Sequence, residues 1–232
     1  IKAKLDAGRA LLYQTARYVD IYKALEDIAR ERKLTPEERA EMKKFSKLAD
    51  AFTPLAKGMN SEYANQNGYD CIQIHGGSGF MLEYACQRIY RDARITSIYE
   101  GTTQLQTVAA IRYVTNGFYS SVIEDYAQMP VASELESVKA RVAAMTEKFN
   151  HCVTLVKEAE NQELHDLCAR HLYEMAADII MCYLLMQNAS KAPELFAQSL
   201  QVFANHSEAE VAKHTSLIER MSAEQVENYR QA

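Results

Sequence analysis

The sequence has few of the residues that interrupt regular secondary structure. Among its 232 residues there are 8 glycines, 4 prolines and no tryptophan. Residues that favour helices, such as alanine, leucine, glutamate, lysine and glutamine, are abundant instead. A chain of this length can bury a sizeable core, as one large or two small domains. We therefore predict an all-α fold.

Long apolar runs and a large charge imbalance are also absent. No apolar stretch approaches the ~18 residues of a membrane-spanning helix, and we expect no secretory leader. Charged residues make up 25% of the chain and sum to a net charge of −5. Nothing in this balance indicates a nucleic acid or a membrane surface as a partner.

The cysteines and histidines lack the spacing of metal ligands. The five cysteines form no CxxC pair and no Cys/His ligand pattern, and the six histidines are scattered. We therefore expect no metal site. An odd number of cysteines in a helical chain favours reduced thiols and a cytoplasmic location.

Apolar residues recur at spacings of three, four or seven, which is typical of amphipathic helices. The first pattern covers residues 2–32 and places Leu5, Leu12 and Leu25 on its apolar face. Polar and charged residues occupy its other faces. The pattern predicts a long helix that packs through this face.

A second helix is predicted to begin at a capping box. Thr35 can cap it, Pro36 suits the first helical position, and Glu38 is the capping-box partner. Pro54 lies inside the pattern and is expected to kink the helix or break its hydrogen-bond ladder locally. An Asn-Gly pair at 67–68 is expected to end it.

The rest of the chain is predicted as helices joined by short loops. We expect a loop over 69–79, a helix over about 82–90, a helix over 102–116 and a poorly patterned connector over 118–131. Later helices should begin near residues 135 and 162, the latter broadly apolar from Leu164 through Leu167 to Met186 and therefore central. A turn over 188–193 and helices over 194–206 and 207–221 should follow. With a boundary in the connector, the predicted domains are 1–118 and 131–232.

The stretch from Gln73 to Gln106 differs from the rest because it combines a glycine cluster with Glu100 directly before Gly101. Gly101 allows a ligand to approach the backbone closely, and Thr102 stands at an N-cap position. A carboxylate beside a free backbone N–H could abstract a proton next to a carbonyl and stabilise the enolate-like oxygen. A solvated glutamate in a tight turn is the alternative.

Other polar features of this stretch have structural explanations. The glycines at 76, 77 and 79 could form a phosphate loop, but the GxGxxG and GKS/T patterns are absent, so a turn is favoured. Three arginines could clamp phosphates, yet acidic residues lie near them in the sequence. We expect structural ion pairs among Arg88, Arg91, Arg94, Glu83 and Asp92.

Two blocks carry a family resemblance: QIHGGSGF with MLEY after it, and RDARITSIYEGTTQLQ. Their wording and separation closely resemble the last part of the catalytic domain of acyl-CoA dehydrogenases. The closer match runs from about the N-terminus to Tyr119. The remainder is similar to a C-terminal helical segment that some bacterial members carry. The resemblance favours a catalytic Glu100 over a solvated one.

The resemblance implies an enzyme that removes the α and β hydrogens of an acyl-CoA thioester as a proton and a hydride to FAD. Glu100 would be the α-proton base, and its backbone N–H would bind the thioester oxygen beside Gly101. Tyr99 would line the acyl pocket. A free glutamate has a pKa near ~4.3, so a dry, ligand-filled site would have to raise it.

The resemblance also implies contacts to the flavin and to other proteins. Thr102 and Gln104 match positions that contact FAD within the subunit. Gln73 and Gly77 match positions that reach the FAD of a neighbouring subunit, and Gly76 allows close backbone approach there. A homo-oligomer and an electron-transfer flavoprotein partner are therefore implied.

The chain also departs from the family pattern. Neither the family's N-terminal helical domain, nor its β-domain, nor its Arg-x-x-Phe-Gly segment precedes Ile1, and there is no initiator Met. We expect a piece of a longer enzyme, inactive alone, in which residues 131–232 act in packing and assembly. The competing hypothesis is a non-catalytic helical module for oligomerisation or interaction.

Overall fold

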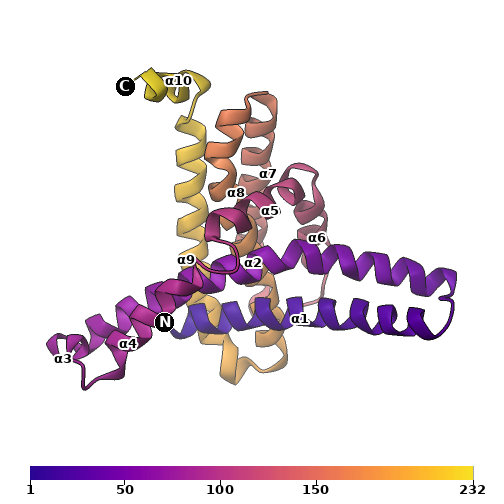
Figure 1. The fold of residues 1–232 in the computed structure, drawn as a ribbon, viewed down its shortest axis with the longest axis horizontal. Coiled ribbons are helices and arrows are strands. Elements are labelled where there is room, and N and C mark those ends of the chain that lie inside the picture. Colours follow the sequence, from indigo (N-terminus) through magenta and orange to yellow (C-terminus); the bar gives the residue numbers. More distant parts are fainter. Residues whose placement is uncertain (232) are drawn as a thin grey trace.

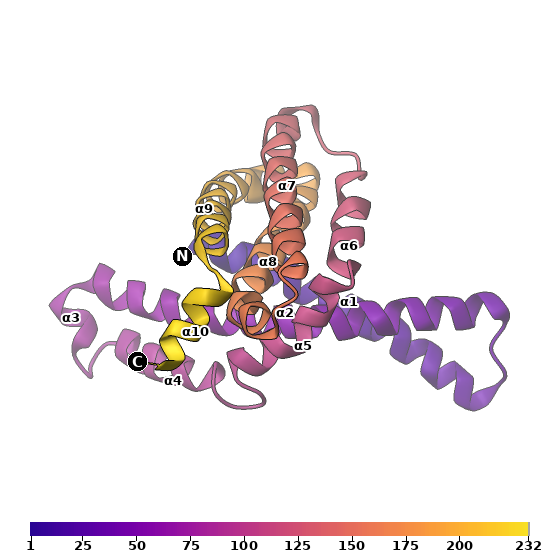
Figure 2. The same ribbon diagram turned by 90° about the horizontal axis from the view of Figure 1, so that it is seen from above.

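The computed structural model describes residues 1–231, which form helices joined by short turns. The helices are α1 (Lys2–Glu31), α2 (Pro36–His75), α3 (Gly77–Phe80), α4 (Ala85–Thr96), α5 (Thr103–Thr115), α6 (Phe118–Ala127), a 3₁₀ turn (Ser133–Leu135), α7 (Glu136–Glu158), α8 (Gln162–Lys191), α9 (Pro193–Arg220) and α10 (Ala223–Gln231). Helices α1 and α2 run antiparallel along the longest axis, and α7, α8 and α9 cross them (Figures 1 and 2). The all-α prediction, with a second bundle packed on the first, is confirmed.

Helix α2 begins as the sequence predicts but ends later. The Glu38 backbone N–H donates to the Thr35 hydroxyl at 3.2 Å, and the Thr35 N–H donates to the Glu38 carboxylate at 2.9 Å. The helix then continues through Pro54 and past the predicted stop to His75, so the predicted loop over 69–79 is wrong. Gly68 does not end the helix, because it is buried where a Cβ would meet Cα of Tyr90 in α4 at 2.9 Å. Its small size serves helix packing instead.

The buried face of α1 differs from the predicted one. Ala7, Leu11 and Leu25 are buried, whereas Leu5 and Leu12 are 44% and 49% exposed. Helix α1 has apolar residues on more than one face, and spacing alone does not say which of them meets α2. The packing against α2, α8 and α9 selects the face that includes Leu11.

Helix α8 is central, as predicted. Every residue from Met175 to Met186 is buried, because α1, α5, α7 and α9 surround it. Leu167 is an exception to the prediction and is 50% exposed. The predicted turn over 188–193 is shorter than expected, because α8 continues to Lys191 and α9 begins at Pro193.

Helix α9 is continuous where the sequence predicts two helices. The second of these was predicted to begin at residue 207, but Ser207 is fully buried inside α9. Phe203, Val211 and Ile218 continue one apolar face across it. The burial of this face outweighs the local capping preference of serine.

The predicted connector over 118–131 is wrong, because it contains α6. Tyr119 and Ile123 are fully buried there. The Tyr119 hydroxyl donates to the Ala51 carbonyl at 2.6 Å, and the Tyr126 and Tyr18 hydroxyls are hydrogen-bonded at 2.8 Å. Tyrosines with buried hydroxyl partners can occupy a core, so a polar-looking segment can still be part of it. One cluster of buried side chains extends across this segment, and the division into domains 1–118 and 131–232 stays a prediction.

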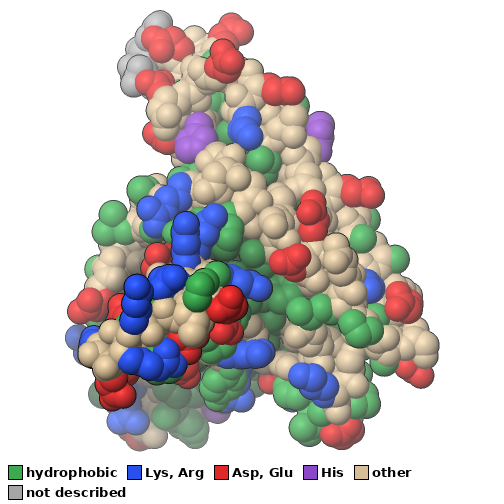
Figure 3. All heavy atoms as spheres, turned by 90° about the vertical axis from the view of Figure 1, so that its right-hand side faces the viewer, with side chains coloured by type: hydrophobic (Ala, Val, Ile, Leu, Met, Phe, Trp, Pro, Cys, Tyr) green, Lys and Arg blue, Asp and Glu red, His purple; other side chains and the backbone are tan. Residues whose placement is uncertain are grey.

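The end of the α1–α2 hairpin carries both signs of charge. Figure 3 shows lysine and arginine side chains beside acidic ones at this end of the molecule. Exposed pairs there include Lys23–Glu26, Arg30–Asp27 and Arg32–Glu38. Within residues 1–231, no helix has the length and apolar character to cross a membrane.

Candidate active site

Glu100 lies in the turn between α4 and α5 in a backbone conformation that side chains rarely adopt. Its φ is 53°, and the φ of Gly101 is 90°. Only glycine adopts this region without cost, so Glu100 is held there by its surroundings. Backbone strain of this kind is common at functional sites.

Side chains from α2 and α5 hold the turn in place. The Lys57 ammonium and the Gln106 amide both donate to the Gly101 carbonyl, the amide at 3.1 Å. The Thr103 hydroxyl donates to the Glu62 carboxylate at 2.6 Å. The sequence analysis missed Lys57 and Glu62, because their helix is about forty residues upstream of the turn. No local pattern identifies them.

The predicted cap on α5 is confirmed. The Leu105 N–H donates to the Thr102 hydroxyl at 3.2 Å. Gln104 lies in the first turn of the same helix and is exposed. Glu100 is also exposed, and among residues 1–231 its carboxylate has no hydrogen-bond or ion-pair partner. The carboxylate is therefore free to act on a ligand.

An apolar groove lies beside the turn. Its volume is about 460 Å³, and it is lined by Tyr99, by Leu12 of α1 and by the face of α2 around Ala56 and Ala64. Tyr99, the predicted acyl-pocket residue, lines this groove and Glu100 does not, and the role of Tyr99 stays a prediction. The exposed face of α1 contributes to the groove through Leu12.

The other predicted cofactor residues lie near the N-terminal end of α4, whereas Glu100 follows its C-terminal end. Gln73 is in the last turn of α2, and Gly76 and Gly77 follow at the junction with α3. A Cβ added to either glycine would meet nothing within 4 Å, so the space beside this backbone is open. Since α4 has 12 residues, it separates this group from Glu100 by ~18 Å. The predicted residues form two groups rather than one.

The predicted ion pairs of α4 are wrong. Arg88, Arg91 and Arg94 are exposed, and in the part of the chain that the structure describes none of them pairs with a carboxylate. Arg94 donates to the Ser97 hydroxyl instead. Exposed pairs within a helix gain only a few tenths of a kcal/mol, so proximity in sequence does not ensure a pair.

A second polar site, which the sequence analysis missed, is buried between α1, α2, α8 and α9. The Tyr63 hydroxyl donates to the Asp178 carboxylate at 3.1 Å at the wall of a cavity of about 210 Å³. Burial raises the pKa of Asp178 to about 7, despite the hydrogen bond from Tyr63 that lowers it. The residues that line this cavity come from four helices, so no sequence motif marks the site.

Glu174 belongs to the same buried site but is ionised. It lies 3.1 Å from Nε2 of His214, whose Nδ1 is 2.9 Å from Nδ1 of His171. Burial raises the pKa of Glu174, but the hydrogen bonds from His214 and Arg170 lower it by more than burial raises it, so the pKa falls to about 2. His171 therefore contacts His214 within this site.

Apolar side chains along both ends of α4 and on its neighbours are exposed. They lie on α3, α4, α5 and the turns between them, and Phe80 and Leu82 are 78% and 84% exposed. The others are Met81, Tyr84, Ile89, Tyr90, Ile95, Ile98, Tyr99, Leu105 and Val108. Exposed apolar side chains in such number are common on surfaces that bind a ligand or another protein.

Two family models together match most of the chain. One, described as the C-terminal domain of acyl-CoA dehydrogenase, matches residues 1–114. The other, described as acyl-CoA dehydrogenase C terminal, matches residues 115–226. The chain belongs to the acyl-CoA dehydrogenase family.

Individual relatives agree with this assignment. The chain is 34% identical over 147 residues to 3-methylmercaptopropionyl-CoA dehydrogenase of Ruegeria pomeroyi, a match that covers 62% of this chain and 22% of the relative. It is 34% identical over 103 residues to the caffeyl-CoA reductase–Etf complex subunit CarC of Acetobacterium woodii, covering 44% of this chain and 21% of that protein. The chain spans about a fifth of the length of these relatives.

A solved structure shows the same fold. The acyl-CoA dehydrogenase of Bacillus anthracis, determined in complex with FAD, superposes with a TM-score of 0.69 at 22% identity. The superposition covers 94% of this chain and 40% of that one.

Proposed function

We propose that this chain supplies the base and one wall of the active site of a flavin-dependent acyl-CoA dehydrogenase. The observation that carries the proposal is the turn at Glu100, where an unpartnered carboxylate directly follows Tyr99, a residue that lines the apolar groove. The rest of the site must come from other parts of the protein or from a neighbouring subunit, because the groove is open.

The residues of the turn have distinct roles in this reaction. The Glu100 carboxylate accepts the α proton of the acyl-CoA thioester, and the Glu100 backbone N–H donates to the thioester oxygen as negative charge develops on it. Gly101 has no side chain beside this N–H, so the thioester can approach. The groove at Tyr99 binds the acyl chain.

The proposed flavin contacts divide between two groups of residues, one at the start of α5 and one at the end of α2. FAD, when bound, supplies the acceptor for the hydride that leaves the β carbon. Thr102 and Gln104 would hold it from the start of α5, next to the base. Gln73, Gly76 and Gly77 would hold the flavin of a neighbouring subunit, and the open space beside the two glycines supports a close backbone contact there.

The proposed partners follow from the exposed surface and from a relative. A homo-oligomer would cover the apolar side chains on α3 and α4 and complete the flavin site. An electron-transfer flavoprotein would accept the electrons, and the CarC relative is named as a subunit of an Etf complex. The acyl-CoA is the reducing substrate.

The proposal is tested by Glu100→Gln in the whole protein. Glutamine keeps the side-chain shape and the backbone N–H but cannot take a proton, so acyl-CoA binding should survive. The rate of flavin reduction, measured by stopped-flow absorbance, should fall by roughly 10²–10⁴. Glu83→Gln, which changes an exposed carboxylate before α4, is the matched control and should leave the rate unchanged.

A Glu100→Gln variant that reduces its flavin at the parent's rate would show that Glu100 is not the base. If the unmodified whole protein binds neither flavin nor acyl-CoA, the non-catalytic helical module is favoured instead.

A further inference from the structure

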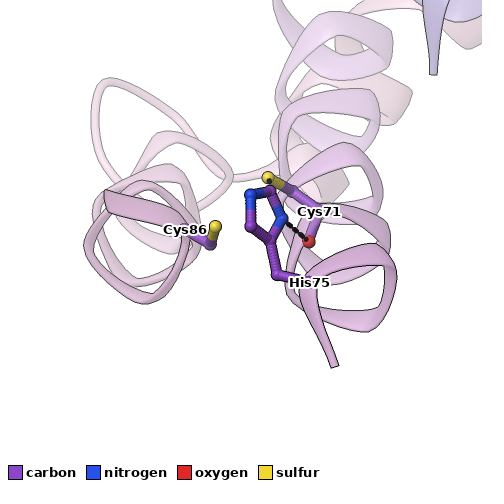
Figure 4. Close-up of side chains that lie close together, drawn as sticks. All are labelled: Cys71, His75 and Cys86. Carbon is purple, nitrogen blue, oxygen red and sulfur yellow. Dashed lines mark hydrogen bonds between the residues drawn. The ribbon is translucent and has the colours of Figure 1, made fainter. Parts of the chain in front are cut away.

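A cluster of two thiols and one imidazole lies at the junction of α2 and α4. Sγ of Cys71, Sγ of Cys86 and a ring nitrogen of His75 all lie within 4.8 Å of one another. Figure 4 shows the imidazole between the two thiols, with Cys71 and His75 on α2 and Cys86 on α4. Cys71 and His75 share one face of α2 because they are four residues apart in a helix.

The packing of α4 against α2 fixes the position of Cys86. The Ser61 hydroxyl donates to the Thr96 carbonyl at 3.0 Å. Further along the pair, the Asn65 amide donates to the Ala93 carbonyl at 3.3 Å, and Gly68 meets Tyr90. The two helices are antiparallel, so successive contacts lie closer to the C-terminus of α2 and to the N-terminus of α4. The next contact in this series places Cys86 beside Cys71. The cluster is therefore held by the helix pair and does not depend on a mobile loop.

The hydrogen bonding of His75 leaves one ring nitrogen ready to bind a cation. Its Nδ1 lies 2.8 Å from the backbone carbonyl of Cys71. A carbonyl only accepts, so Nδ1 carries the proton and the neutral ring has its lone pair at Nε2. Histidines that bind metals commonly donate their other N–H to a backbone carbonyl in this way.

The two sulfurs lie within 4.8 Å of each other as well as of the imidazole. A hydrogen bond between the Cys71 and Cys86 thiols raises the pKa of Cys71. Cys86 is buried, Cys71 is partly buried and His75 is exposed, so the cluster opens to solvent on the histidine side. Two thiolates and one imidazole form a soft, mixed donor set that suits Zn²⁺.

We propose that Cys71, His75 and Cys86 bind one Zn²⁺ ion. The three side chains occupy three corners of a tetrahedron, and water or an external ligand takes the fourth from the solvent side. The bound ion links the last turn of α2 to the first turn of α4. It thereby stiffens the backbone directly before Gly76, at the junction between α2 and α3. This site is separate from Glu100, and its existence does not depend on the proposed enzymatic reaction.

The test is a Co²⁺ titration of the whole protein, stripped of metal and reduced with a phosphine. One equivalent should produce thiolate-to-cobalt charge-transfer absorption and the visible bands of tetrahedral Co²⁺, and Zn²⁺ should displace them. Cys71→Ser should reduce the charge-transfer intensity by about half, since one of two thiolates is lost. It should also weaken binding by more than the ~100-fold that loss of a supporting partner of a metal ligand causes.

His75→Gln provides a variant that should fold, since His75 is exposed. It should weaken Co²⁺ binding while its melting temperature without metal stays at the parent's value. His151→Gln, which changes an exposed histidine on α7, is the matched control and should bind like the parent. The proposal is overturned if the reduced parent shows no charge-transfer absorption. It is equally overturned if His75→Gln and His151→Gln bind Co²⁺ with the same affinity.

Discussion

The ammonium group of Lys57 donates a hydrogen bond to the main-chain carbonyl of Gly101, the residue directly after Glu100. Lys57 lies in the middle of α2, 44 residues earlier in the chain. The conformation of the turn therefore depends on a charge-assisted hydrogen bond from a different helix. In the proposed reaction, this bond determines where the Glu100 carboxylate and N–H point.

Replacing Lys57 should misplace the proposed base without removing it. In Lys57→Met the apolar stem of the side chain is kept, and only the donor to Gly101 is lost. We expect the rate of flavin reduction to fall ~10- to 100-fold because catalysis is sensitive to small displacements. The control is Lys43→Met, an exposed lysine on the same helix. Equal rates in the two variants would show that Lys57 does not position the turn.

Two glycines should respond differently to the same substitution. In Gly101→Ala the new Cβ would lie 2.7 Å from Nε2 of Gln106, at a φ of 90°, so we expect a loss of ~1–3 kcal/mol in the free energy of unfolding. In Gly77→Ala the new Cβ meets nothing within 4 Å, and we expect a change within about 0.5 kcal/mol. Urea denaturation measures both. Similar losses in the two variants would contradict the left-handed turn at Gly101.

The buried carboxylate Asp178 should make stability depend on pH. Its pKa is raised from 3.8 to about 7, so between these values the folded protein binds more protons than the unfolded chain. Its contribution to stability is full below about pH 4 and is lost as the pH rises through 7. Asp178→Asn should therefore gain stability relative to the parent as the pH rises from 4 to 8, by up to about 4 kcal/mol.

Glu174→Gln is the control of opposite sign. The pKa of Glu174 is lowered from 4.5 to about 2, so its stabilisation is present above pH 4.5 and is lost as the pH falls toward 2. The variant should be less stable than the parent at neutral pH and should approach it in acid. Denaturant unfolding across the pH range checks both variants. A pH profile of Asp178→Asn that parallels the parent's would show that Asp178 is ionised in the folded protein.

The two proposed flavin groups can be tested by mixing subunits. Gln104→Ala and Gln73→Ala should each lower the flavin content of the purified oligomer. If Gln104 and Gln73 contact one flavin from different subunits, a mixed oligomer contains some sites with neither change and some with both. Co-expression of the two variants should therefore restore part of the flavin content, measured as absorbance per protein. No recovery in the mixture would place both residues on the same subunit's flavin.

Local signals predicted the starts of α2 and α5 correctly and the end of α2 wrongly. The capping box at Thr35 and the cap at Thr102 are satisfied within a few residues, so their energies are decided by neighbours in sequence. The end of α2 is not decided locally. The sequence predicts that α2 ends at Gly68, but α4 packs on this glycine and the helix continues to His75.

The error at Gly68 also concealed the proposed metal site. With a loop predicted over 69–79, Cys71 and His75 have no defined relation to each other, and their spacing of four carries no meaning. On a continuous helix the same spacing places both on one face. Cys86 then joins them through the packing of α4 on α2, which no spacing rule expresses.

The sequence by itself determined that the chain is helical, where most helices start, that the segment around Leu172 is central and that Glu100 stands in a glycine turn before α5. These features depend on residues close together in the chain, and propensity, periodicity and caps record them directly. Only the tertiary structure decided which face of α1 is buried, that Lys57 holds the Glu100 turn, and that Tyr63 meets Asp178 in the core. Each of these depends on the packing of segments far apart in sequence, where burial energies outweigh local preferences.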